Sequence, residues 1–199
     1  MPTRRTKTEL QKQKQRLSTL RRVLPSLELK RRRLQSAWVE GRREVEALSA
    51  ELDAVVARAG EALPMLADER FELEGLCRVG RVDLEWRNIA GVRVPALAHA
   101  EVVVEPYSKL ARPHWVDSLV ERWKQSAALA LELRLARRRV ETLDHARSKT
   151  TQRVNLFEKI LIPRAETSIR EIEIYLGDLE RAAVVRSKVA KAKREALEQ

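Results

Sequence analysis

Four side chains of this sequence belong to the types that most often bind metals or act as nucleophiles, namely one cysteine and three histidines. His99, His114 and His145 are far apart and show no His-x-x-x-His spacing, and Cys77 is the only cysteine. Structural and catalytic zinc sites use closely spaced nitrogen and sulfur ligands, so this spacing argues against a metal site. A single cysteine also excludes a disulfide framework within the chain and favours a reducing compartment.

The carboxylates do not suggest catalysis either. Asp and Glu are interspersed with Lys and Arg at intervals typical of surface pairing on helices. The sequence contains no Gly-x-x-x-x-Gly-Lys phosphate loop, no Gly-x-Ser-x-Gly elbow and no His-Glu-x-x-His. We therefore expect a protein that is not itself an enzyme and that uses no cofactor.

Basic side chains at the two ends of the chain are the remaining candidates for binding. Residues 1–33 contain twelve Lys and Arg against two acidic residues, and the whole chain carries a formal charge of +11. Such ends can bind nucleic acid or acidic phospholipid, or can be solvated helix faces. A single-stranded nucleic-acid site would interleave aromatic side chains for base stacking, and residues 1–33 contain none.

Long helices are needed to position these charges. With 35 % charged residues and few glycines, prolines and aromatics, the composition is typical of a coiled coil. From Leu10 to Val55, steps of three and four residues define fourteen seam positions, of which eleven are apolar. This pattern predicts a left-handed coiled coil, with a local kink at Pro25. The N-terminal seam includes Leu17, Leu20, Leu24, Leu27, Leu34, Leu48 and Leu52.

A C-terminal seam runs from Val140 to Leu197. Between Leu161 and Ala165 the step is four residues where the alternation requires three, so one extra residue enters the pattern beside Pro163. Because proline removes a backbone donor, we expect the helix to bend there and the seam to move to a neighbouring stripe. The C-terminal seam includes Val154, Phe157, Leu161, Ile169, Ile172, Leu176 and Leu179.

The sequence thus predicts a mainly α protein in which residues 1–60 and 114–199 form a long antiparallel two-helix coiled coil. For the middle region, 61–113, we expect a short helix over 62–76 and a small β-hairpin over about 82–105. We interpret Pro95–Ala98 as the hairpin turn and Asn88–Gly91 as a bulge. No apolar run is long enough for a signal peptide or a membrane span, so the chain is expected to be neither secreted nor membrane-spanning.

Three motifs of the sequence are "KTTQRVNLFEKILIPRAETSI", "NIAGVRVPAL" and "LELKRRRL". They resemble, in this order, the K-T-x-R-R-V-N-A-L-E-x-x-x-I-P, N-V-x-G-x-x-V-P-x-L and L-L-K-x-K-R-D-x-L motifs of the D-subunit family of V-type (vacuolar and archaeal-type) rotary ATPases. The residues on which these motifs depend include Lys30, Arg31, Asn88, Gly91, Pro95, Arg153, Asn155, Glu158 and Pro163.

The resemblance implies a non-catalytic rotor shaft in the central stalk, which couples ATP hydrolysis or synthesis in a hexamer of A and B subunits to H⁺ or Na⁺ transport. It also implies that the hairpin region carries the F subunit and that the lower end seats in a funnel-shaped subunit (C or d) on the membrane ring. The location would be peripheral, on the cytoplasmic face of the membrane, and the bend at Pro163 would make the shaft asymmetric. The tip would present Arg4, Arg5, Lys7, Arg186, Lys188 and Lys191 to the surrounding hexamer.

Two alternatives stay open from the residues alone. One is a basic coiled-coil protein that binds nucleic acid, which predicts an affinity that falls steeply with salt. The other is a generic coiled-coil scaffold, for which the hairpin and C-terminal motifs have no explanation.

Overall fold

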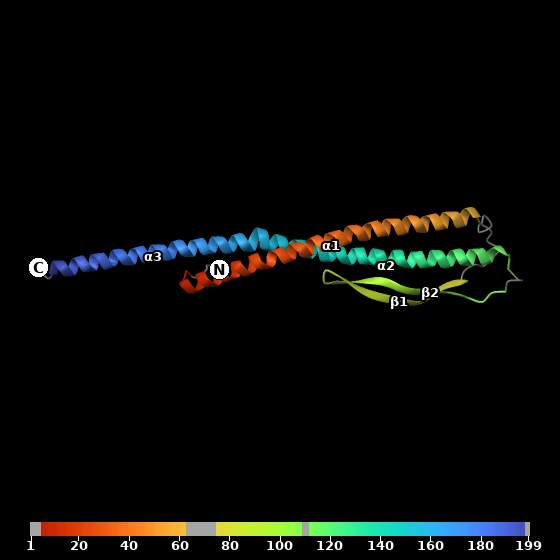
Figure 1. Cartoon of the computed structure of the whole chain (residues 1–199), viewed down its shortest axis with the longest axis horizontal. Helices are drawn as coiled ribbons and strands as arrows, with labels where there is room; N and C mark the ends of the chain where they lie inside the picture. Colours follow the sequence, from red (N-terminus) through yellow and green to blue (C-terminus); the bar gives the residue numbers. More distant parts are fainter. Residues whose placement is uncertain (1–4, 63–74, 109–111, 198–199) are drawn as a thin grey trace. The chain divides into compact units, whose positions relative to one another are not determined.

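Two long helical stretches and a β-hairpin make up the part of the chain that the computed structural model describes, residues 5–62, 75–108 and 112–197. The elements follow in the order α1 (Lys7–Ala62), β1 (Cys77–Ile89), β2 (Val92–Val104), α2 (Trp115–Leu156), the π-helix η2 (Phe157–Leu161) and α3 (Ile162–Leu197) (Figure 1). The predicted mainly α fold, with long N- and C-terminal helices and a hairpin between them, is confirmed. The short helix predicted over 62–76 falls almost entirely outside the described residues.

Thr6 caps the start of α1. Thr6 precedes the helix and its Oγ1 accepts a hydrogen bond from the backbone N–H of Glu9 at 3.2 Å. A Thr at this position satisfies one of the free N–H groups of a first helical turn. The sequence Thr-Lys-Thr-Glu therefore explains why α1 begins at Lys7.

The chain divides into two compact units, which are described separately. Unit 1 comprises Met1–Lys30 and Thr150–Gln199, and unit 2 comprises Arg31–Lys149. In unit 1 the first part of α1 runs antiparallel to α3, so the start of α1 lies on the side toward which α3 ends (Figure 1). The coiled-coil pairing expected from the two seams is consistent with this arrangement.

The π-helix η2 accounts for the irregular step in the C-terminal seam. The N–H of Ile162 bonds to the carbonyl of Phe157, five residues earlier, where an α-helix would bond four residues earlier. Such a turn inserts one residue into an α-helix. It ends two residues before Pro163, beside which the seam pattern contains its one extra residue.

The hairpin turn differs from our prediction. β1 and β2 pair antiparallel from Cys77↔Val104 to Ile89↔Val92, so Pro95 lies within β2 opposite Trp86. The turn consists of Ala90 and Gly91, both with positive φ (50° and 79°). A two-residue loop of type I′ requires this conformation at both positions. The prediction of a turn at Pro95–Ala98 is therefore wrong.

The bulge predicted at Asn88–Gly91 is also wrong, because the register irregularities lie between Val79 and Val82 and between Asp83 and Leu84. Asn88 instead supports the turn, since its Oδ1 accepts a hydrogen bond from the N–H of Gly91 at 2.8 Å. Pro95 is tolerated in β2 because each strand of a two-stranded ribbon has one edge where no ladder donor is needed.

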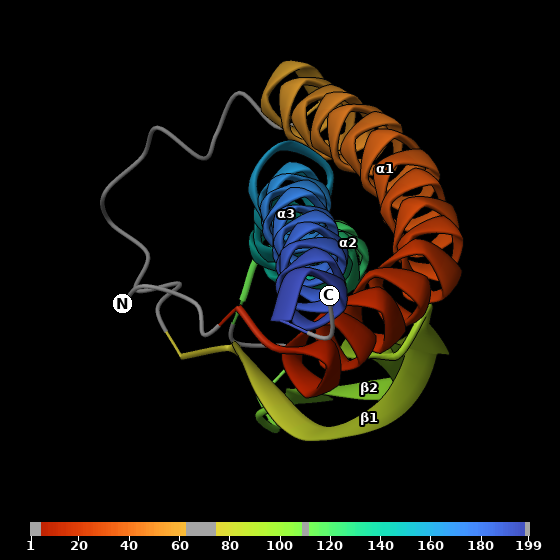
Figure 2. The ribbon, with the colours of Figure 1, turned by 90° about the vertical axis from the view of Figure 1, so that its left-hand side faces the viewer.

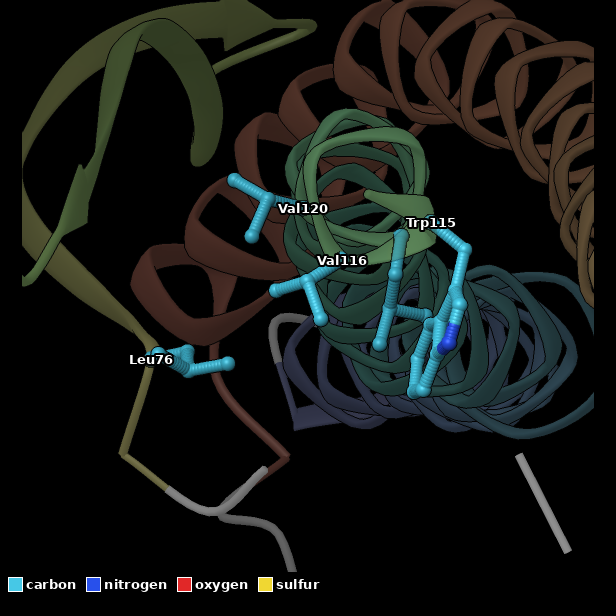
Figure 3. Close-up of a cluster of buried hydrophobic side chains, with 5 residues drawn as sticks. Leu76, Trp115, Val116 and Val120 are labelled. Atoms are coloured by element: carbon cyan, nitrogen blue, oxygen red, sulfur yellow. The ribbon is translucent and has the colours of Figure 1, made fainter. Parts of the chain in front are cut away.

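Unit 2 contains two groups of buried apolar side chains. One joins the start of β1 to the start of α2 through Leu76, Trp115, Val116 and Val120, whose side chains gather in Figure 3. The other consists of Leu34 on α1, Val94 on β2 and Leu143 on α2. These groups fix the hairpin against the helices of unit 2, and Figure 2, which views the helices nearly end-on, shows both strands on one side of α2.

Candidate interaction surfaces

Three ion pairs set the register of the helices in unit 1. They join Lys7 to Glu180 (3.4 Å), Lys14 to Glu173 (2.7 Å) and Arg21 to Glu166 (2.6 Å). Successive pairs are seven residues apart on both helices, which is the heptad period of a coiled coil. Each pair is exposed and contributes only about 0–1 kcal/mol, so this ion ladder defines alignment more than stability.

The seam residues differ in their burial along the helices. Leu20, Leu34, Val154 and Ile172 are buried. The half-buried seam residues are Leu17, Leu24, Leu27, Leu48, Leu52, Phe157, Leu161, Ile169 and Leu176. Leu179, in contrast, is 43 % exposed. Because α1 begins at Lys7, beside Glu180, its described part covers α3 no further.

The basic tip predicted from the sequence lies in unit 1, with Arg4 outside the described residues. The guanidinium of Arg5 lies over the ring of Tyr175, 5.5 Å from its centroid. Every described side chain from Asp178 to Arg194 is exposed, and this stretch includes Arg186, Lys188 and Lys191. The tip therefore presents positive charge on an exposed helical surface.

The residues of the C-terminal motif differ in their exposure to solvent. Asn155 is half-buried, whereas Arg153, Glu158 and Pro163 are exposed. In the first-helix motif, Lys30 and Arg31 are half-buried.

An arginine and a tryptophan occupy adjacent seam positions in unit 2. The Arg147 guanidinium lies 4.3 Å from the centroid of the Trp38 ring, and its N–H groups donate to Gln35 (3.1 Å) and Asp144 (2.7 Å). Arg42 lies over the same ring at 5.3 Å. Cation–π contact and hydrogen bonds thus accommodate a charged side chain in an apolar seam.

The hairpin is held against α1 and α2 by its inner face. Val94 is 1 % exposed and packs between Leu34 and Leu143. Arg139 on α2 links the same elements, because it donates to the carbonyl of Pro95 (3.4 Å) and to Glu44 of α1 (2.7 Å). Sequence reasoning missed Arg139, since nothing in its local pattern distinguishes it from the neighbouring arginines.

The opposite side of the hairpin presents apolar side chains to solvent. Leu84 and Trp86 lie two residues apart on β1 and therefore on one face, and Leu97 of β2 pairs with Leu84. Trp86 is 63 % exposed and Leu84 45 %. Leu97 is half-buried, so Leu84 and Trp86 are the exposed members of this group, and neighbouring exposed apolar side chains are candidates for a protein-binding surface. We call Leu84, Trp86 and Leu97 the outer hairpin face.

Titratable side chains do not gather into a metal site in the described residues. Across that part of the chain, no group of three His, Cys, Asp or Glu residues could hold a metal ion. Burial raises the pKa of the Cys77 thiol, which favours its neutral form. The hydrogen bond that Tyr107 donates to Asp117 raises the pKa of the Tyr107 phenol and ties the end of the hairpin to the start of α2.

No described helix is long and apolar enough to cross a membrane.

Comparison with known proteins gives one consistent family. Residues 9–192 match the model of the family described as the ATP synthase D subunit. A V-type ATP synthase D subunit of Borreliella burgdorferi is 35 % identical to this chain, over 94 % of this chain and 92 % of the relative. Proteins of the same name from Chlamydia trachomatis and Chlamydia pneumoniae are 32 % and 29 % identical, over 94 % of this chain and 94 % and 91 % of their own lengths.

Proposed function

The chain belongs to the family of ATP synthase D subunits, and from this membership we propose that it is the non-catalytic rotor shaft of a V-type ATPase complex. A subunit by definition works within a multisubunit complex. In this complex the shaft couples ATP hydrolysis or synthesis in the hexamer of A and B subunits to ion movement across the membrane. Its location is peripheral, on the cytoplasmic face.

The antiparallel helix pair of unit 1 is the observation that carries this proposal. A shaft must transmit torque, and two helices with interlocking seam residues resist twisting better than one. The ion ladder and the buried seam residues Leu20, Val154 and Ile172 hold this pair together. Torque transmission needs no catalytic group in the shaft itself.

The basic tip is proposed to face the inner wall of the A/B hexamer. Exposed cations attract acidic side chains over a Debye length of roughly 8 Å in physiological salt, and each exposed pair contributes only about 0–1 kcal/mol. Contacts this weak keep the shaft near the axis of the hexamer and still allow it to rotate. Arg5, Lys7, Arg186, Lys188 and Lys191 supply these cations in the described residues.

The outer hairpin face is proposed to bind the F subunit. Its exposed apolar side chains need a cover in the assembled complex, and the hairpin is fixed from behind by Val94 and Arg139. A surface that is held rigidly binds with less loss of conformational freedom. The end of α1 and the start of α2 in unit 2, which are joined by the hydrogen bond from Arg122 to the carbonyl of Arg58, are proposed to seat in the funnel-shaped subunit on the membrane ring.

An affinity-tagged chain purified from native membranes tests the proposal. A and B subunits, a small F subunit and the funnel-shaped subunit should be recovered together with it. Recovery with nucleic acid in a salt-sensitive form, or with none of these subunits, would refute the shaft function.

Substitution of Trp86 tests the assignment of the hairpin separately. Trp86→Ala should lower the recovery of the F subunit at least fivefold and leave the recovery of A and B subunits unchanged. Leu29→Ala is the matched control, because Leu29 is also largely exposed (52 %) but lies on α1. Equal loss of the F subunit in both variants would contradict the assignment to the hairpin.

A further inference from the structure

Proline interrupts both helices of unit 1 at the same level. The ion ladder fixes which residues lie opposite each other, and four residues beyond the pair of Arg21 and Glu166 it brings Pro25 opposite Ile162. Pro163 is the next residue of α3. Since proline has no backbone N–H, each helix lacks one donor of its hydrogen-bond ladder at this level.

The π-helix η2 adds a third irregularity beside these two. It covers Phe157–Leu161 and therefore ends two residues before Pro163. Its hydrogen bonds span five residues where α-helical bonds span four, and π turns are less regular than α turns. Within a few residues, both members of the helix pair thus depart from regular α-helical bonding.

Complete burial of the seam side chains does not compensate for the missing backbone bonds at this level. The seam residues Leu24, Leu27, Phe157 and Leu161 are all only half-buried. On one side of them Leu20 and Ala165 are 8 % and 4 % exposed, and on the other side Val154 is fully buried. Ile160, within η2, is 53 % exposed. The seam is therefore only partly buried where the backbone ladder is interrupted, as it also is at Leu17, Ile169 and Leu176.

We propose that Pro25, Pro163 and η2 together form a flexible joint, at which the helix pair of unit 1 bends and twists more readily than on either side. Continuous backbone hydrogen bonds and interlocked side chains are what make a helix pair stiff. Segments with interrupted backbone bonding open at lower free-energy cost than the regular helix on either side. A shaft under torque deforms first at its most compliant level, which this joint supplies. The proposal goes beyond the shaft function and holds for the isolated chain even if that function is wrong.

Amide hydrogen exchange of the isolated full-length chain tests the joint directly. In the wild type, the amides of 157–162 should exchange at least tenfold faster than those of 167–176, because local opening exposes them more often. The double variant P25A/P163A should restore both donors and reduce this difference to less than threefold. P25A alone should slow exchange in 157–162 as well as in α1, because the two prolines share a level.

Gly177→Ala is the matched control. Gly177 lies inside α3, and a Cβ added there meets no atom within 4 Å. The substitution raises helix stability through propensity alone, at a distance from the joint. It should slow exchange in 167–176 and therefore keep or widen the difference between the two segments. If G177A removes the difference as fully as P25A/P163A does, global stability explains the exchange and the joint is refuted.

Pulsed electron paramagnetic resonance gives a second readout that does not depend on exchange. Spin labels at Gln152 and Arg170 lie on exposed positions of unit 1 on either side of η2 and Pro163, in a C77A background. Eighteen residues of straight α-helix span about 27 Å. The distance distribution should be broad in the wild type and at least twofold narrower in P25A/P163A, with no change in G177A. Equal widths in the wild type and the double variant would overturn the proposal.

Discussion

Val94 offers the sharpest test of how the hairpin is held, because one small side chain connects three elements. Its side chain is 1 % exposed and packs between Leu34 of α1 and Leu143 of α2. Val94→Ala removes two buried methyl groups, which at about 0.8 kcal/mol each amounts to about 1.6 kcal/mol. The cavity that remains adds to this cost. An isolated two-stranded hairpin is marginal in water, so the loss should appear as local opening of β1 and β2.

Native-state amide exchange of the paired amides in 84–97 measures this opening. A loss of about 1.6 kcal/mol corresponds to exchange that is about 10- to 20-fold faster, since each 1.4 kcal/mol is a factor of about ten. Trp86→Ala is the control, because Trp86 lies on the same hairpin with 63 % of its surface exposed. It should change exchange less than threefold. If V94A leaves exchange within twofold of the wild type, or if W86A accelerates it equally, the three-residue contact does not hold the hairpin.

Further substitutions test the remaining contacts. Gly41→Leu should lower the free energy of unfolding by about 1–3 kcal/mol in chemical denaturation, because even a Cβ at Gly41 would lie 3.0 Å from Cγ2 of Val140. Ala90→Gly should slow hairpin exchange severalfold, because Ala90 has a φ of 50° that glycine adopts without strain. Removing the hydrogen-bonding carboxylate in Asp117→Asn should lower the pKa of Tyr107 in a spectrophotometric titration. In the wild type the raised pKa means that this contact stabilises the fold below about pH 10 and is lost as the pH rises through the folded-state pKa.

The helical part of the fold could be predicted because its signal repeats. Fourteen seam positions share one period in α1, so single exceptions such as Arg31 do not hide the pattern. Even the π-helix has a sequence trace, the extra residue between Leu161 and Ala165. A seam pattern that repeats over many helical turns tolerates single exceptions, whereas a hairpin turn is specified by a few residues only.

The hairpin turn could not be found by the same means. Its location depends on two residues, and Ala90 with positive φ is rare for a residue with a Cβ. Pro95 and the small residues after it are the commoner turn signal, yet Pro95 lies within β2. The inner contact of Val94 with Leu34 and Leu143 joins three distant segments, and no local pattern contains that information.

The evenly spaced ion ladder does not by itself distinguish the observed alignment of α1 and α3 from one that is shifted by a heptad. If α3 slid by one heptad, Lys7 would meet Glu173 and Lys14 would meet Glu166, and the pair would lose a single weak attraction. The same slide would place Pro25 opposite Asn155, in regular helix, and would separate it from the level of Pro163. The shared level of Pro25 and Pro163 thus distinguishes the observed alignment from the shifted one, which the repeating ion pairs alone do not.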